Sequence, residues 1–196
     1  KFNPFFEINS NVTINKINEN IISNLNLGKI ISKKEIIKKL NNNSKINYEK
    51  KFLELNLIDK LFTNIQLEHG KLNLSGEINF SGGKLIFKAD SLLLDDYPRL
   101  NFQSLIQVND SDIFLKKVSI KKRFDKKNFN LKIVGSLNLI NNKISFKEIN
   151  IEDFDYYANE EDIKFFKESF QNILLKDNLF KILDLGNIKS FLEEII

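Results

Sequence analysis

The sequence contains no cysteine, methionine or tryptophan and only one histidine, His69. Without cysteine there can be no disulfide framework, no thiolate zinc site and no cysteine nucleophile. One histidine cannot complete a zinc set built on several histidines, and no Gly-x-Ser-x-Gly motif offers a serine that it could activate. His69 stands beside Gly70 in front of a strand pattern, so we interpret it as a turn residue. These absences predict that the chain is not an enzyme.

A long apolar run and a secretory signal are also absent, so the sequence shows neither a membrane-spanning helix nor a targeting segment. The lack of methionine and the apolar final residues, Ile195 and Ile196, predict a segment of a longer protein. The hydrophobic fraction of 42% and charged fraction of 29% predict a folded core. The net charge of +4 comes almost entirely from lysine, which A/T-rich genomes encode by default, so it indicates no particular anionic partner.

The N-terminal part mixes strand and helix patterns. Alternating apolar and polar residues over 5–15 predict a strand. Helical spacing over 21–40 predicts two helices separated near Gly28, the second opening at Ser32 with Glu35 as a capping box. The polar stretch 41–51 is typical of a loop.

The period of the pattern changes to two between residues 65 and 151, which predicts a run of strands. The preceding segment, 52–61, is expected to form a short helix, with a strand as the alternative. The alternation slips at Glu148, which we place at a bulge. Ser81-Gly82-Gly83, 125–127 and Asn141-Asn142 are expected to be turns. The predicted strands are 72–80, 85–89, 102–108, 113–120, 129–139 and 144–151.

Helical spacing returns after Asn159, which is expected to cap a helix whose first turn is acidic. Ile163, Phe166, Phe170 and Ile173 form an apolar stripe. This stripe could pack in the core, close the end of a groove or bind a partner. We expect one domain in three parts: a strand and helical region at 1–62, repeated β-hairpins at 63–155 and C-terminal helices at 156–196.

The hairpin region contains an internal repeat. A shift of 59 positions places Gly76 on Gly135 (135 − 76 = 59) and Phe87-Lys88 on Phe146-Lys147. Alternation alone explains the matched apolar positions, but it does not explain the shared glycine, the shared lysine after the turn or the shared Phe-Lys pair. Repeated hairpins indicate a sheet that grows by repetition.

A sheet with one apolar face must cover that face. The strands have more apolar positions than the apolar stripes of the predicted helices can cover. The sheet therefore either closes into a sandwich or barrel, or curls part-way and leaves an apolar trough. A mid-strand glycine lets a sheet bend or a ligand approach closely. The expected fold class is mostly β with flanking α: a curved antiparallel sheet forming a groove or open half-barrel, with helices at the N-terminal and C-terminal ends.

The runs 72–88 and 131–147 resemble the strand repeats in the C-terminal region of AsmA-like proteins, the family of AsmA, TamB and YhdP, which is related to the repeating-β-groove lipid-bridge proteins. The resemblance implies a periplasmic β-groove of a protein anchored in the inner membrane, carrying phospholipid towards the outer membrane. It implies no catalytic residue, metal or cofactor. Its implied partners are phospholipid, the membrane through parts of the parent protein not present here, and other envelope proteins. The lipid-contacting residues it implies are Leu72, Leu74, Ile78, Phe80, Leu85, Phe87, Leu131, Ile133, Leu137, Leu139, Ile144 and Phe146.

Two other functions remain open. The first is a β-rich structural or protein-interaction scaffold without a ligand. The second is a nucleic-acid-binding module built on a basic cluster, although a solvated hairpin edge or attraction to anionic lipid headgroups explains the cluster better. We therefore expect no nucleic-acid partner. The cluster comprises Lys116, Lys117, Lys121, Lys122, Arg123, Lys126 and Lys127.

Two further motifs are better explained by a structural role than by ligand binding. Ser81-Gly82-Gly83-Lys84 joins two predicted strands, whereas a phosphate-binding loop leads into a helix, so we predict a hairpin turn. The carboxylates Asp95-Asp96 and Glu152-Asp153-Asp155 lack the ordered spacing of a calcium loop and follow predicted strands. We interpret both groups as solvated strand ends.

Overall fold

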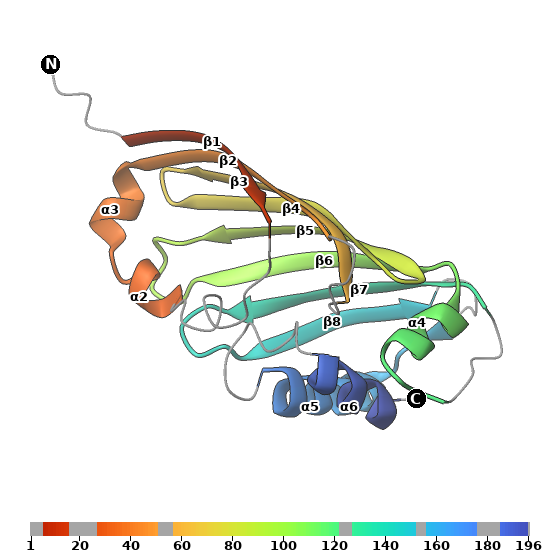
Figure 1. The fold of residues 1–196 in the computed structure, drawn as a ribbon. Coiled ribbons are helices and arrows are strands. Elements are labelled where there is room, and N and C mark those ends of the chain that lie inside the picture. The colour runs from red at the N-terminus through yellow and green to blue at the C-terminus, as the bar shows by residue number, and fades with distance from the viewer. Residues whose placement is uncertain are drawn as a thin grey trace, which may run out of the picture.

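A computed structural model of the chain describes residues 6–15, 27–50, 57–121, 127–151, 156–175 and 185–195. A nine-stranded sheet forms its centre, and each strand pairs with the next strand along the chain (Figure 1). The first and last strands do not pair, so the sheet is open, and the mostly-β prediction is confirmed. The strands are β1 Phe6–Ile14, β2 Leu40–Glu49, β3 Ile58–Glu68, β4 Lys71–Phe80, β5 Gly83–Leu92, β6 Arg99–Val108, β7 Phe129–Asn138, β8 Ile144–Ile151 and β9 Tyr156–Tyr157.

The sheet is antiparallel from β2 to β9, but β1 pairs with β2 in parallel. The wholly antiparallel prediction is therefore wrong for this one pair. The connection from Ile14 to Leu40 is long enough to return the chain to the same end of the sheet, which a parallel pair requires.

Helices stand at both ends of the chain, as predicted, and one lies in its middle. In Figure 1, α2 and α3 lie at one end of the strands, α4 lies at the opposite end, and α5 and α6 lie beneath β8. The bounds are α2 Leu27–Ile31, α3 Lys34–Lys39, α4 Ser111–Lys117, α5 Glu160–Ser169, the π-helix η2 Phe170–Leu174 and α6 Leu185–Ile195.

The loop predicted at 41–51 is wrong, because most of this asparagine-rich segment is strand β2. The polar side chains are accommodated in this strand because they form hydrogen bonds with one another: Ser44 Oγ lies 2.7 Å from both Asn42 Oδ1 and Ser10 Oγ. Tyr48, only 2% exposed, faces the core from the same strand. Pairing with β1 and β3 therefore overrides the weak local preference. In the next predicted segment, 52–61, residues 52–56 lie outside the described part of the chain, and from Ile58 onwards the strand alternative is correct, because β3 begins there.

The strand predicted at 113–120 is also wrong, because residues 111–117 form α4. The Ile113 amide donates to Asp110 Oδ1 at 3.0 Å, which caps the helix.

Two details of the N-terminal helices differ from the prediction. Gly28 lies inside α2, and the helix predicted before it lies outside the described residues. The capping box at Ser32 is absent, because α3 starts at Lys34 and Ser32 Oγ instead donates to the Lys29 carbonyl at 2.8 Å.

The two copies of the repeat form equivalent hairpins, β4–β5 and β7–β8. Gly76 lies opposite Phe87 in the first hairpin, and Gly135 lies opposite Phe146 in the second. The second hairpin differs by a bulge. The register passes from Val134–Glu148 to Gly135–Phe146, so Lys147 has no residue opposite it on β7. The bulge predicted at Glu148 is therefore confirmed.

The pleat gives the sheet an apolar face, which includes Leu72, Ile78 and Leu85, and a polar face, which includes Asn73, Glu77 and Lys84. Helices cover the two ends of the apolar face with separate buried clusters. The cluster at the α2–α3 end comprises Ile31, Ile37, Leu93, Leu137, Leu139, Ile144 and Leu175. The cluster at the α4 end comprises Leu115, Val118 and Ile120, packed against Leu57, Phe114, Ile188 and Leu192.

Candidate functional site

A continuous aliphatic row crosses the apolar face between the two buried clusters. Each of its six residues lies directly opposite the next, from β3 to β8, and each is partly buried. Neither buried cluster contains any of them. With neighbouring strands about 4.8 Å apart, the row is roughly 24 Å long. We call it the central row: Leu61, Ile78, Leu85, Ile106, Leu131 and Ile151.

Two phenylalanine rings lie on the apolar face over glycine backbone. A β-carbon on Gly76 would lie 2.8 Å from the Phe87 ring, and one on Gly135 would lie 2.7 Å from the Phe102 ring. Each ring thus fills the space that another residue type would need for its own side chain. The mid-strand glycines therefore hold aromatic rings close against the sheet.

The twelve sequence-predicted lipid contacts separate into two groups. Eight are partly buried, and three of these, Ile78, Leu85 and Leu131, belong to the central row. The other four are buried, and three of them, Leu137, Leu139 and Ile144, belong to the cluster at the α2–α3 end, so these three do not line an exposed surface. These four are Ile133 at 8% exposed, Leu137 at 5%, Leu139 at 4% and Ile144 at 5%.

Sequence reasoning missed three residues of the central row, Leu61, Ile106 and Ile151. The pattern over 52–61 predicts a helix that includes Leu61, and Ile106 lies in a strand outside the repeat. Ile106 and Ile151 do sit in alternating patterns, so the alternation itself was sufficient to include them.

The C-terminal aromatic stripe packs on the β8 side of the apolar face. Phe146 meets Phe166 and Phe170 edge-to-face, with ring centroids 5.0 and 5.3 Å apart, and Phe191 of α6 contacts both of those rings. The core interpretation of this stripe therefore accounts for Phe166 and Phe170.

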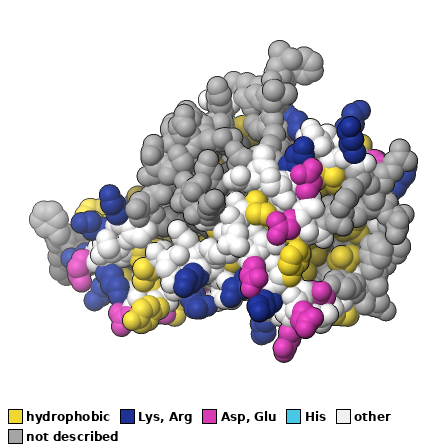
Figure 2. Space-filling view, turned by 90° about the horizontal axis from the view of Figure 1, so that it is seen from below, with side chains coloured by type: hydrophobic (Ala, Val, Ile, Leu, Met, Phe, Trp, Pro, Cys, Tyr) yellow, Lys and Arg dark blue, Asp and Glu magenta, His cyan; other side chains and the backbone are white. Residues whose placement is uncertain are grey.

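Seen from below (Figure 2), the described residues show hydrophobic side chains singly or in small groups among lysines and acidic residues.

Another aromatic contact covers the opposite end of the face. Phe80, at the end of β4, lies 5.4 Å from Phe114 of α4, measured between ring centroids. Both ends of the apolar face are therefore protected by helices, and the central row lies between them.

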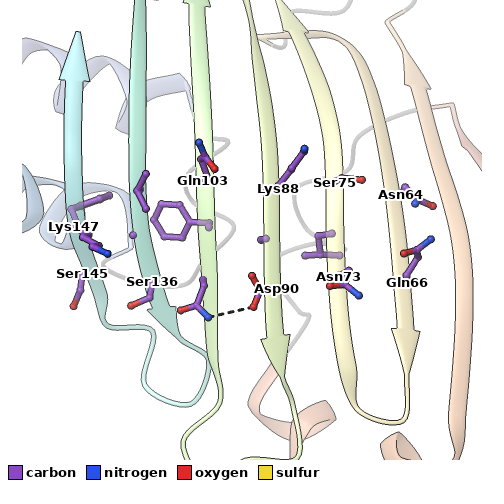
Figure 3. A pocket seen from close by; sticks show the side chains of 17 residues that line it. Asn64, Gln66, Asn73, Ser75, Lys88, Asp90, Gln103, Ser136, Ser145 and Lys147 are labelled. Carbon is purple, nitrogen blue, oxygen red and sulfur yellow. Dashed lines mark hydrogen bonds between the residues drawn. The ribbon is translucent and has the colours of Figure 1, made fainter. Parts of the chain in front are cut away.

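An open hollow of about 750 Å³ lies on the polar face, across β3 to β8. Figure 3 shows that amide, hydroxyl and charged side chains line it, including Lys88 and Asp90. Asn101 Nδ2 donates to Asp90 at 3.4 Å across two neighbouring strands. This hollow is not the apolar trough that the sequence predicts, because most of its lining comes from the opposite side of the pleat. Five residues from positions on the apolar side also border it, and two of them, Leu74 and Phe146, are predicted lipid contacts; the other three are Ala89, Phe102 and Gly135.

Ion pairs on the polar face join neighbouring strands. Lys132 Nζ lies 2.9 Å from Glu148 Oε1, and Lys60 Nζ lies 2.8 Å from Glu49 Oε1. The hydrogen bond and the charge of Glu49 raise the pKa of Lys60. The Lys60–Glu49 pair is exposed and the Lys132–Glu148 pair partly buried. An exposed pair contributes little to stability.

The described residues of the basic cluster singled out in the sequence do not lie along one hairpin edge. Lys116 and Lys117 occupy the last turn of α4, where positive charge complements the helix dipole. Partial burial, and next the nearby Lys50 ammonium, lower the pKa of Lys117. Lys121 and Lys127 are exposed, whereas residues 122–126 lie outside the described part of the chain.

The motifs considered for catalysis or metal binding take structural positions. His69 and Gly70 form the β3–β4 turn with φ of 48° and 83°, as a type I′ turn requires. Residues 81–82 form the β4–β5 hairpin turn, within the turn predicted at 81–83. Asp96 pairs with Lys34 at 3.1 Å, and Glu152-Asp153-Asp155 lie outside the described residues. Within the described ranges, no three His, Cys, Asp or Glu side chains gather as a metal site. No described helix has the length and apolarity needed to cross a bilayer.

Comparisons with protein-family models, with curated proteins and with solved structures found no match to this chain. The residues and the geometry described above are therefore the basis of the functional proposal.

Proposed function

We propose that this chain is a non-enzymatic lipid-binding segment of a bacterial envelope protein, in which acyl chains lie along the apolar face of the sheet. The observation that supports it is the central row, an uninterrupted aliphatic surface across β3 to β8 that stays partly exposed. An ordinary core would bury such a row, as the helices bury Leu137 and Ile144 nearby.

The dimensions of the row suit hydrocarbon. One leaflet of a bilayer core is about 15 Å deep, so a row roughly 24 Å long can accommodate one extended acyl chain. Each methylene removed from water stabilises the complex by about 0.8 kcal/mol. The attraction is non-directional, so the row would select for hydrocarbon and not for a particular headgroup.

The wider setting is part of the same proposal and rests on the resemblance to AsmA-like repeats. The parent protein would be anchored in the inner membrane, and this segment would lie in the periplasm and carry phospholipid between the inner and outer membranes. Its partners would be phospholipid, the membrane and other envelope proteins. The repeated glycine–phenylalanine hairpins support growth of such a groove by addition of equivalent units.

The test is native mass spectrometry of the purified chain together with lipid extraction. Leu85 and Ile86 are neighbours on β5, and both are partly buried, but they point to opposite faces. Leu85→Asn should remove most of the co-purified phospholipid, whereas Ile86→Asn should retain it. Equal lipid content in the two variants, with both folded by circular dichroism, would count against the proposal.

A scaffold without a ligand is the second candidate. Burial of four of the expected lipid contacts and the closure of both ends of the apolar face favour it. A scaffold would release no lipid on extraction from the unmodified chain, so the same experiment separates the two functions.

A further inference from the structure

Three segments far apart in sequence meet at the α3 end of the sheet: α3, the β5–β6 connection and the β7–β8 turn. Their buried residues Ile37, Leu93 and Leu139 belong to one cluster. Lys34 of α3 pairs with Asp96 of the connection at 3.1 Å, and the Leu139 amide donates to the Pro98 carbonyl at 3.1 Å. These contacts hold the three segments together as one tip of the molecule.

Each of these segments also exposes a large apolar side chain next to a buried residue. Ile36 is 58% exposed beside Ile37, Tyr97 is 78% exposed beside Pro98, and Ile140 is 55% exposed beside Leu139. Single exposed apolar residues are ordinary on a protein surface, but three on adjoining segments require an explanation. We call these three residues the tip surface.

The segments that form the tip surface are basic overall. Residues 33–39, 92–99 and 140–143 contain six lysines or arginines and three acidic residues. One of the acids, Asp96, is already paired with Lys34. This excess of positive charge opposes association of two copies through the same surface, and it complements an anionic one.

We propose that the tip surface docks on an anionic lipid membrane, with its three apolar side chains inserted shallowly among the headgroups and acyl chains. Tyrosine favours the membrane interface because its ring is apolar and its hydroxyl is polar. Lysines around shallowly inserted apolar side chains add attraction to anionic headgroups. This docking does not depend on acyl-chain binding by the central row, which lies on the sheet face between the two buried clusters.

The absence of tryptophan makes a direct test possible, because one introduced indole is the only one in the chain. Tyr97→Trp places it in the tip surface. Ile113→Trp places it at a site 52% exposed on α4, at the opposite end of the sheet. With vesicles of phosphatidylcholine and phosphatidylglycerol, Tyr97→Trp should shift to shorter emission wavelength and be quenched by brominated acyl chains. Ile113→Trp should do neither, and identical behaviour of the two variants would overturn the proposal.

Vesicle flotation supplies the second measurement. The double variant Tyr97→Ser with Ile140→Ser should bind these vesicles about tenfold or more weakly, whereas Ile113→Ser should bind like the unmodified chain. All three positions are exposed, so the fold should persist, and circular dichroism checks this. Unchanged binding by the double variant would exclude insertion at the tip. Failure of the unmodified chain to float, or sedimentation without vesicles, would also overturn the proposal.

Discussion

Two mid-strand glycines control how closely aromatic rings approach the apolar face. The space for a β-carbon at Gly76 is taken by the Phe62 carbonyl oxygen and the Phe87 ring, and at Gly135 by the Ser145 carbonyl oxygen and the Phe102 ring. A flexible side chain can move aside, but a carbonyl in a hydrogen-bonded sheet cannot move without disturbing its ladder. The glycines are therefore required by packing, in addition to any role in bending the sheet.

Gly76→Ala should destabilise the fold by about 1–3 kcal/mol, because the added methyl group overpacks the space between β3 and the Phe87 ring. The measurement is the midpoint of urea unfolding. Ser75→Ala, one position earlier on the polar face, is the matched control and should change stability by less than about 0.5 kcal/mol. Equal loss in the two variants would show that the close approach at Gly76 has no energetic consequence.

The sequence predicts which residues of the repeated hairpins lie on the apolar side, but it does not predict which of them other segments bury. Alternation places Ile78, Leu85 and Leu131 on one face, as the strand register shows. Leu137 and Ile144 follow the same alternation, yet they are buried against Leu175 and α2–α3. Periodicity describes which side a residue takes, whereas burial depends on segments distant in sequence.

At the scale of elements, local chemistry identified some segments and tertiary pairing decided others. The β4–β5 and β7–β8 turns and the Asn159 cap follow from short-range signals and are confirmed, whereas most of the turn predicted at 125–127 lies outside the described residues. Strand β2 is rich in asparagine, and only its two neighbours and the bonds of Ser44 explain it. The mixed apolar and basic residues of α4 fit a strand pattern as well as a helix, and the Asp110 cap together with packing on Phe80 favours the helix.

The capping box at the start of α5 should make a measurable contribution to the free energy of unfolding. Asn159 Oδ1 accepts from the Asp162 amide at 2.9 Å, and the Asn159 amide donates back to Asp162 Oδ2 at 3.2 Å. Asn159→Ala should therefore cost about 1 kcal/mol of unfolding free energy. Asn172→Ala, at an exposed position of η2, should leave the denaturant midpoint unchanged. A cost below about 0.3 kcal/mol for Asn159→Ala would mean that packing of α5 on β8, and not the cap, sets the start of the helix.

At the scale of the whole molecule, the helices divide the apolar face into sealed ends and a partly exposed middle. The α2–α3 end and the α4 end each have a buried cluster, and the C-terminal aromatic residues pack along β8. The open sheet leaves the central row between them. The proposed lipid binding therefore depends on this middle region, and the tip surface is a separate feature at one end.

The most direct test of the central claim uses the methyl groups on the two sides of the sheet. Leu85 and Ile106 point to the apolar face, while Ile86 and Leu105 point to the polar face of the same strand pair. In a sample with methyl-labelled isoleucine and leucine and bound phospholipid, nuclear Overhauser effects from acyl-chain protons should appear at Leu85, Ile106 and the rest of the central row. They should be absent at Ile86 and Leu105. Acyl-chain contacts on the polar face, or on neither face, would contradict the account.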